Sequence, residues 1–288
     1  MVKFGPSGNS ESFYDQGYKS SVDMPEWLAK MGLDAYEYQC SKGVKISEET
    51  ARKLGDNARA NNIYLSIHAP YYINLASEEE SKRVNSVGYV LDTLKVARWM
   101  GAERVVVHTG SCSKVSRKRA LETAISTLSE TIREADEAGY GDIAICPEVL
   151  GKINQLGSLE EILEMCRLDE RLIPTVDFGH LHARELGALN SVEDFEKVLI
   201  TIENSIGYER LKRIHCHFSR VEFTAGGEKK HWRISDTQYG PEFEYLAEVL
   251  VKKDMSPVII CESRNYMAED ALKLKEIYEN VKRRLTGV

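Results

Sequence analysis

The residues in this sequence with the clearest capacity for chemistry are histidines and carboxylates placed where short apolar runs end. Six runs end in such a residue or carry one near the end: His68, His108, Glu148, Asp177, the pair His215 and His217, and Glu262. A single one of these would most often be a loop contact, but six together are a pattern. Imidazole with carboxylate is a ligand set that suits zinc, and also manganese or iron. Gathered carboxylates repel one another unless cations or protons lie among them. The pattern therefore predicts a site for divalent metal ions.

Two further histidines fall within reach of the same site. His180 follows Asp177 by three residues, and His231 lies after Gly226-Gly227 in a long loop that we expect to follow the seventh strand. We expect both to bind metal, while His182 is expected to point elsewhere or to support the ligands.

The elements that must position these residues are apolar runs alternating with amphipathic segments. The expected strands are Val2–Gly5, Ala35–Gln39, Ile63–His68, Arg104–His108, Ile143–Glu148, Ile173–Asp177, Arg213–Phe218 and Val258–Glu262. Most are continuous and β-branched, which is typical of parallel strands covered on their outer faces. The expected helices are Ser47–Asn61, Ser81–Met100, Ser116–Ala138, Ser158–Arg167, Ser191–Ile206, Pro241–Lys252 and Ala268–Arg284, several with a serine N-cap.

This alternation predicts one α/β domain over residues 1–288, a (β/α)₈ TIM barrel with the metal site at the C-terminal face of the strands. An open, doubly wound sheet is the alternative. Its dinucleotide-binding version lacks support, because no GxGxxG motif follows the first strand.

Composition excludes several other classes. The chain has 288 residues, of which 42% are hydrophobic, and six cysteines with no CxxC pair, so we expect a reduced, cytoplasmic monomer. Neither a signal peptide nor a membrane-spanning stretch is visible. The net charge of −7 weighs against a nucleic-acid partner. Basic residues nevertheless gather in 114–119 and 210–230. These clusters are either solvated loops and helix starts or a rim that binds anions.

Several close divalent ions have a characteristic chemistry. They lower the pKa of a water molecule and neutralise the charge that builds on a phosphate under attack. Glu148 is the best candidate to bridge two ions, and Glu262 is a second acid that either binds a metal or orients the attacking water. No Ser–His–Asp triad is evident.

The order of these motifs resembles one family. The segment His68-Ala-Pro-Tyr-Tyr-Ile-Asn-Leu75 is similar to the signature after strand three of the endonuclease IV family (apurinic/apyrimidinic endonuclease family 2). The other matching positions are His108-Thr-Gly-Ser111, Glu148-Val-Leu-Gly151, Asp177-Phe-Gly-His180, His215, His231 and Glu262-Ser263. The resemblance covers about residue 63 to the C-terminus and involves several separate motifs.

The resemblance implies a barrel with three zinc ions that hydrolyses the DNA backbone on the 5′ side of abasic sites during base excision repair. The first ion would be held by His68, His108 and Glu148, and the second by Glu148, Asp177, His215 and Glu262. The third would be held by His180 and His231. Tyr71 and Tyr72 would wedge into double-stranded DNA at the lesion; without the resemblance they would be rim or core aromatics. Manganese is the alternative metal.

Three departures from the family pattern concern the third ion and DNA recognition. Lys229 stands where the family has an aspartate two residues before the last histidine, so Glu228, Asp236 or water must replace it, or the third site is weak or empty. The segments Gly5–Asn9 and Gln39–Gly43 also differ from the family loops. Two ions are thus better supported than the third.

Two other functions stay open. The first is a sugar isomerase or epimerase similar to the xylose isomerases, which also place His, Glu and Asp at strand ends around divalent metals. The missing aspartate and the acidic charge favour it, whereas the Tyr-Tyr-Ile-Asn-Leu segment and the Asp-x-x-His spacing favour the nuclease. The second, a non-catalytic metal-stabilised binding protein, leaves the many ligands that face the mouth without a purpose.

Overall fold

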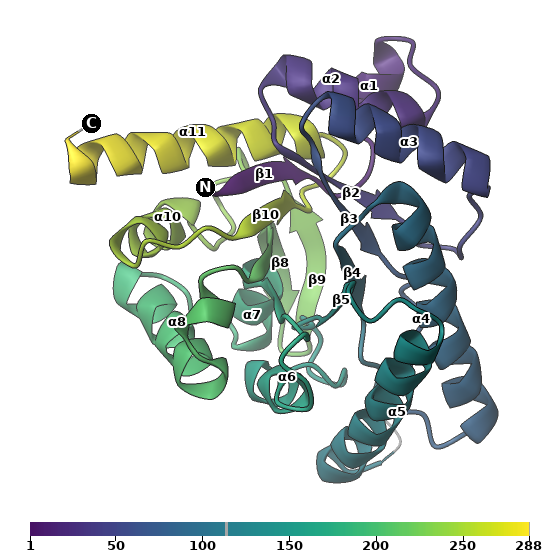
Figure 1. Cartoon of the computed structure of the whole chain (residues 1–288). Coiled ribbons are helices and arrows are strands. Elements are labelled where there is room, and N and C mark those ends of the chain that lie inside the picture. The colour runs from purple at the N-terminus through teal and green to yellow at the C-terminus, as the bar shows by residue number, and fades with distance from the viewer. Residues whose placement is uncertain (113–114, 288) are drawn as a thin grey trace.

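The strands of the chain close into a barrel of parallel strands, seen in a computed structural model that describes residues 1–112 and 115–287 (Figure 1). Two four-stranded sheets, ordered β1-β10-β7-β6 and β2-β3-β4-β5, form most of the wall. Parallel bridges Ser7–Glu37 and Glu148–Thr175 join the two sheets along both seams. The predicted (β/α)₈ barrel is therefore confirmed, and the open sheet is not.

The strand bounds agree closely with the expected runs. The barrel strands are β1 Lys3–Pro6, β2 Ala35–Gln39, β3 Tyr64–His68, β4 Arg104–Val107, β5 Ala144–Pro147, β6 Thr175–Asp177, β7 His215–Phe218 and β10 Val258–Cys261. The helices that match predicted segments are α3 Glu48–Ala60, α4 Glu80–Met100, α5 Arg117–Glu137, α6 Leu159–Cys166, α8 Val192–Ile206, α10 Phe243–Lys252 and α11 Met267–Thr286. Ser47, Ser116, Ser158 and Ser191 each accept a hydrogen bond from a backbone N–H of the first turn, as expected of N-caps.

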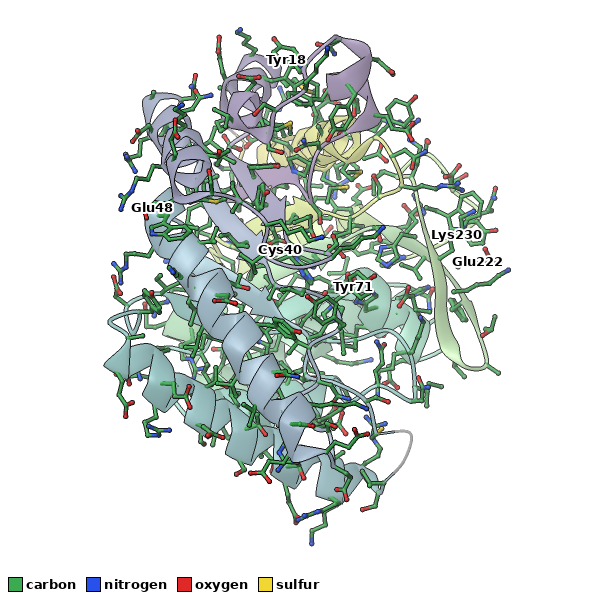
Figure 2. All side chains as sticks on the ribbon, turned by 90° about the vertical axis from the view of Figure 1, so that its right-hand side faces the viewer. Tyr18, Cys40, Glu48, Tyr71, Glu222 and Lys230 are labelled. Atoms are coloured by element: carbon green, nitrogen blue, oxygen red, sulfur yellow. The ribbon has the colours of Figure 1, made fainter. Side chains whose placement is uncertain are left out.

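Other elements were not expected from the sequence. The short helices are α1 Glu11–Asp15, the 3₁₀ turn η1 Ser21–Asp23, α2 Met24–Met31, α7 Phe178–Arg184 and α9 Tyr208–Leu211. The antiparallel hairpin of β8 Arg220–Thr224 and β9 Gly227–Trp232 occupies what we expected to be a loop. Figure 2 shows this hairpin standing out from the barrel, with Glu222 and Lys230 on it.

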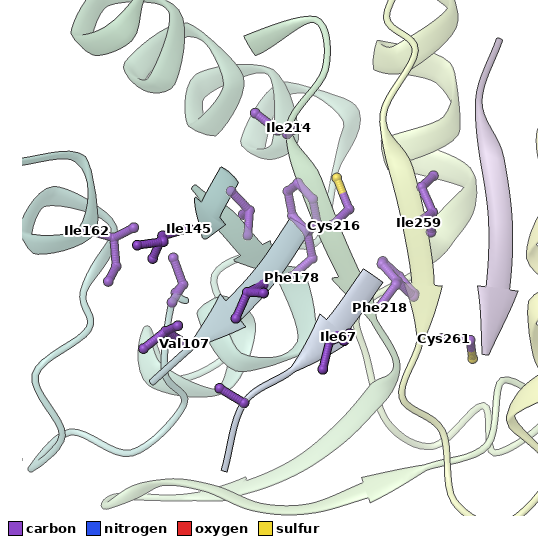
Figure 3. Packing of buried hydrophobic residues seen from close by; sticks show 14 of the residues in the cluster. Ile67, Val107, Ile145, Ile162, Phe178, Ile214, Cys216, Phe218, Ile259 and Cys261 are labelled. Atoms are coloured by element: carbon purple, nitrogen blue, oxygen red, sulfur yellow. The ribbon is translucent and has the colours of Figure 1, made fainter. Parts of the chain in front are cut away.

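Alternation along each strand separates two kinds of side chain. Ile67, Val107, Cys216 and Ile259 are among the buried residues that pack in the large cluster outside the strands (Figure 3). Their neighbours in sequence point into the barrel, because successive residues of a strand face opposite sides. The polar residues at the strand ends share this inward set, and so they meet at the mouth.

The remaining expectations concern cysteines, membranes and the basic cluster. All six cysteines are buried and free. Among the described residues, no helix is both long and apolar enough to cross a membrane. Lys114, in the first basic cluster, lies outside the described residues.

Two glycines provide a paired test of how helices pack around the barrel. A Cβ added at Gly55 in α3 would lie 2.1 Å from the backbone oxygen of Met100, whereas one added at Gly88 in α4 meets nothing within 4 Å. We expect Gly55→Ala to lower the free energy of unfolding by about 1–3 kcal/mol through overpacking. Gly88→Ala should raise it by up to about 1 kcal/mol through helix propensity. Urea unfolding of both variants checks the sign, and equal effects would contradict this packing.

Candidate metal centre

Histidines and carboxylates from the ends of several barrel strands and the loops after them surround a cavity of about 330 Å³ at the barrel mouth. Its polar lining consists of Gln39, His68, Tyr71, His108, Glu148, Lys152, Gln155, His180, Glu228, His231 and Glu262. Three groups of ligand atoms lie around it, and a fourth, made of Glu37, His215 and His217, lies beneath. The ligand atoms of each group are close enough together to hold one metal ion.

The first group is His68, His108 and Glu148. His68 Nδ1 donates to the carbonyl oxygen of Ala69 at 2.7 Å, which leaves Nε2, 3.3 Å from Glu148 Oε2, as the nitrogen that can bind either a proton or a metal ion. His108 Nε2 lies 2.9 Å from the same oxygen. Burial opposes a charge on His68, but Glu148 outweighs this effect and raises its pKa to about 9. The two imidazoles thus converge on one buried carboxylate oxygen.

The second group shares Glu148 and adds Asp177, His217 and Glu262. His217 Nδ1 lies 3.1 Å from Glu148 Oε1 and 3.5 Å from Glu262 Oε2. Ser7 Oγ donates to the other oxygen of Glu262 at 3.0 Å and so holds this carboxylate in place. Asp177 Oδ1 accepts from the backbone N–H of His180, while its buried Oδ2 has no hydrogen bond from any described residue. Burial raises the pKa of Asp177.

The structure places His217, not His215, in this group, contrary to our expectation for strand seven. Both side chains point into the barrel, because they are two residues apart on β7. His217 is level with Asp177 on β6, whereas His215 is level with Thr175, one layer deeper. His215 Nε2 instead contacts Glu37 at 2.8 Å, beneath the mouth. The sequence alone indicates that both histidines face the barrel interior, but not which of them lies nearer the mouth.

The third group is His180, Glu228 and His231. His180 Nδ1 lies 3.0 Å from the carbonyl oxygen of Val149 and donates to it, so its Nε2 carries a lone pair. That atom lies 3.2 Å from His231 Nε2, and His231 Nδ1 lies 2.9 Å from Ser219 Oγ. Each Nε2 also lies 3.6 Å from an oxygen of Glu228. Two imidazole nitrogens and a carboxylate that face one another need a cation or a proton between them.

A β-bulge brings Glu228 to the face of the hairpin that carries His231. Residues two apart on a strand share a face, so position 229 would normally accompany His231. Here the register of the hairpin shifts, so that Glu222 pairs with Lys230 and Phe223 with Glu228. Lys229 is the extra residue of the bulge, and its ammonium group pairs with Glu222. The bulge therefore turns Glu228 toward the mouth, beside His180 and His231, and its role as a metal ligand stays a prediction.

The remaining predicted residues lie near the mouth or away from it as follows. Tyr71 borders the cavity and is 54% exposed, and Tyr72, 45% exposed, packs edge-on against Tyr89. His182 points away, as expected: it is buried against Phe223, and its Nδ1 accepts from the backbone N–H of Leu189. Sequence reasoning missed Glu37, which sits in the middle of β2 rather than at its end.

The chemistry of these groups fits divalent ions. Glu148 belongs to two of the groups and is fully buried, as is Asp177. The pKa of Glu148 is held well below its usual range, because the histidines around it overcome the effect of burial. One oxygen of Asp177 has no hydrogen bond and is therefore available to bind a metal ion. Carboxylate oxygens and imidazole nitrogens that face one another are suitable ligands for a divalent metal.

Comparison with known proteins defines the class to which this barrel belongs. The model of the xylose isomerase-like TIM barrel family matches residues 25–283, so the chain belongs to that family. Within it, the chain is a divergent relative of the endonuclease IV proteins. A protein of Aquifex aeolicus named Probable endonuclease 4 is 26% identical over 285 residues, covering 97% of this chain and 99% of the relative.

Other similarities are broader. An uncharacterized protein of Methanocaldococcus jannaschii is 33% identical over 281 residues and covers 98% of both chains. Among solved structures, endonuclease IV from Thermus thermophilus superposes with a TM-score of 0.64 at 21% identity, covering 93% of this chain and 96% of its own. A D-tagatose 3-epimerase-like protein superposes with a TM-score of 0.69 at 24% identity, covering 93% and 98%. These two structures support the fold.

The bulge makes adjacent residues a matched pair for testing the third group. We expect Glu228→Ala to release one equivalent of zinc at a chelator concentration that leaves the other ions bound, because His180 and His231 lose their carboxylate. The weakening should exceed the roughly 10–100-fold that loss of an outer hydrogen-bond partner costs. Lys229→Ala should leave zinc content unchanged, since that side chain is exposed and pairs with Glu222. Elemental analysis checks both; loss of zinc only in the Lys229 variant would contradict the assignment.

Proposed function

We propose that this protein is a metal-dependent endodeoxyribonuclease that hydrolyses the phosphodiester 5′ to abasic sites in double-stranded DNA. The observation that carries the proposal is the set of three ligand groups around one cavity, with Glu148 shared by two of them. Moving a proton or hydride on a free sugar does not require the additional group His180, Glu228 and His231. The full-length similarity to proteins named as endonuclease 4 supports the same conclusion.

In this proposal the residues divide into three ligand sets. His68, His108 and Glu148 hold one zinc ion; Glu148, Asp177, His217 and Glu262 hold a second; and His180, Glu228 and His231 hold a third. Manganese is the alternative ion. Bound divalent ions would make water nucleophilic near neutral pH and would stabilise the charge on the phosphate.

The chain itself positions the phosphate and the acids around it. Ser7 fixes Glu262 at the mouth through its hydrogen bond, and Lys152 adds a positive charge to the cavity lining. Tyr71 and Tyr72 stand at the rim, where exposed rings can stack on bases next to a lesion. Water would attack phosphorus, the bond to the 3′-oxygen would break, and a 3′-hydroxyl would remain upstream of the abasic sugar.

A sugar epimerase is the second candidate. Glu148, Asp177, His217 and Glu262 form a complete four-ligand group by themselves, and one metal held in this way is sufficient for chemistry on a free sugar. The two candidates differ in what they require of the third group. Replacing Glu228 with alanine should therefore lower nuclease activity, whereas epimerase activity should be retained.

The decisive experiment incubates the zinc-loaded protein with a duplex that carries one synthetic abasic site. We expect a single incision 5′ to the site, lost with chelator and restored by zinc or manganese, because the ions supply the reactivity of the water. A matched duplex without the lesion is the control, and free ketohexoses are followed by NMR in parallel. Absence of incision with zinc, manganese or magnesium would overturn the proposal; epimerised sugar would favour the second candidate.

The tyrosines at the rim test recognition separately from metal binding. Tyr71→Ala with Tyr72→Ala should weaken binding to the abasic duplex by roughly 1–3 kcal/mol per stacked base, if stacking there resembles that on single strands. Zinc content should not change. The double Phe variant keeps both rings and should bind as the unaltered protein does. Equal affinity of all three proteins in a fluorescence-anisotropy titration would argue against a stacking role.

A further inference from the structure

A carboxylate that belongs to none of the three ligand groups lies directly beneath them. Glu37 is on β2, and its side chain has no exposed surface. Burying an ionised carboxylate is costly unless hydrogen bonds and nearby positive charge compensate for it. Ser66, His215 and His217 lie at 2.8–3.1 Å from the two oxygens of Glu37 and supply this compensation.

One oxygen of Glu37 is committed to the barrel wall. Oε2 accepts from Ser66 Oγ at 2.9 Å and from His215 Nε2 at 2.8 Å. His215 Nδ1 faces the Arg104 guanidinium at 3.4 Å, which can only donate, so the hydrogen of His215 is on Nε2. His215 therefore donates to Glu37, and this oxygen is held by two donors from the wall.

The other oxygen of Glu37 faces the histidine of the second ligand group. Glu37 Oε1 lies 3.1 Å from His217 Nε2 and 3.3 Å from Gln39 Nε2. The two atoms of the contact to His217 are close but do not form a hydrogen bond, and that nitrogen has no hydrogen bond to any described residue. The opposite nitrogen, Nδ1, faces Glu148 and Glu262. The ring of His217 thus stands between a buried carboxylate below and the ligand group above.

We infer that Glu37 is a positioning residue that keeps the hydrogen of His217 on Nε2, so that the Nδ1 lone pair is directed at the metal held with Glu148, Asp177 and Glu262. A carboxylate that accepts from the far nitrogen of a ligating histidine fixes both its tautomer and its orientation, and it makes the near nitrogen a better ligand. Glu37 is not itself a ligand in this arrangement, because one of its oxygens is occupied by Ser66 and His215 and the other faces Nε2. The inference rests on the metal centre of the proposed function, but not on the nature of the substrate.

The sequence explains why this support comes from β2. Glu37 is level with Ser66 on β3 and belongs to the inward-facing set of its strand, as do Ala35 and Gln39. Gln39, two residues nearer the mouth, donates to Ser7, which in turn donates to Glu262. Strand β2 therefore supports two members of the second group. Glu37 contacts His217 directly, and Gln39 supports Glu262 by way of Ser7.

Glu37→Gln tests the inference with little change of shape. The amide of glutamine can donate to His217 Nε2 and so favours the tautomer with the hydrogen on Nδ1, which blocks the metal. We expect the affinity for zinc at the second group to fall by roughly 10–100-fold, measured by competition with a chromophoric chelator. Ser66→Ala is the matched control, because it removes a donor to the other oxygen of Glu37; its zinc affinity should stay close to that of the unaltered protein.

A spectroscopic readout on the unaltered protein covers the case in which Glu37→Gln fails to fold. In the cadmium-loaded protein with isotope-labelled histidine, NMR coupling should link the metal to Nδ1 of His217, with the hydrogen on Nε2. Coupling through Nε2, or unchanged zinc affinity in Glu37→Gln, would overturn the inference. If the unaltered protein binds no metal, this inference and the metal centre both fail. If zinc binding behaves as expected and abasic DNA is not incised, only the proposed substrate is wrong.

Discussion

The convergence of imidazoles on the buried carboxylate of Glu148 is the interaction on which the rest of the mouth depends. His68 and His108 approach one oxygen of this side chain, and His217 approaches the other. The carboxylate follows directly on β5, and its ligand partners come from β3, β7 and the loop after β4, so the site forms only when the barrel closes. Folding and assembly of the site are therefore one event. The helices outside the strands contribute by holding the wall in register.

The negative charge of the acidic side chains around the mouth is compensated in two different ways. At the rim, Glu228 and Glu262 are partly exposed, and water screens part of their charge. Deeper down, Glu148, Asp177 and Glu37 have no such screening and rely on histidines and hydroxyl groups. Glu148 and Asp177 are equally buried, but three histidines contact Glu148 and lower its pKa, whereas at Asp177 burial outweighs the nearby histidines and raises the pKa. The net charge of −7 is a poor guide to such a local arrangement.

The sequence was sufficient to predict which strands form the barrel and which residues reach its mouth. Strand ends are readable because apolar runs stop abruptly at His68, Asp177 and Glu262, and parallel strands carry their ends to one face. Depth within the barrel was not readable. His215 and His217 share a face, and only the pairing of β7 with β6 shows which is level with Asp177. Glu37 escaped notice because it interrupts a strand instead of ending it. The hairpin β8–β9 escaped notice because most of its residues are charged or polar and form no apolar run.

The bulge at Lys229 has a consequence for how the history of this site is reconstructed. An alignment assigns ligands by column, and in the column of the missing aspartate this chain has a lysine. Judged in that way, the third group would lack its carboxylate. In the structure the preceding residue, Glu228, faces His180 and His231, because the strand bulges at Lys229. A residue missing from its expected position in the sequence is therefore no proof that its chemistry is missing from the site.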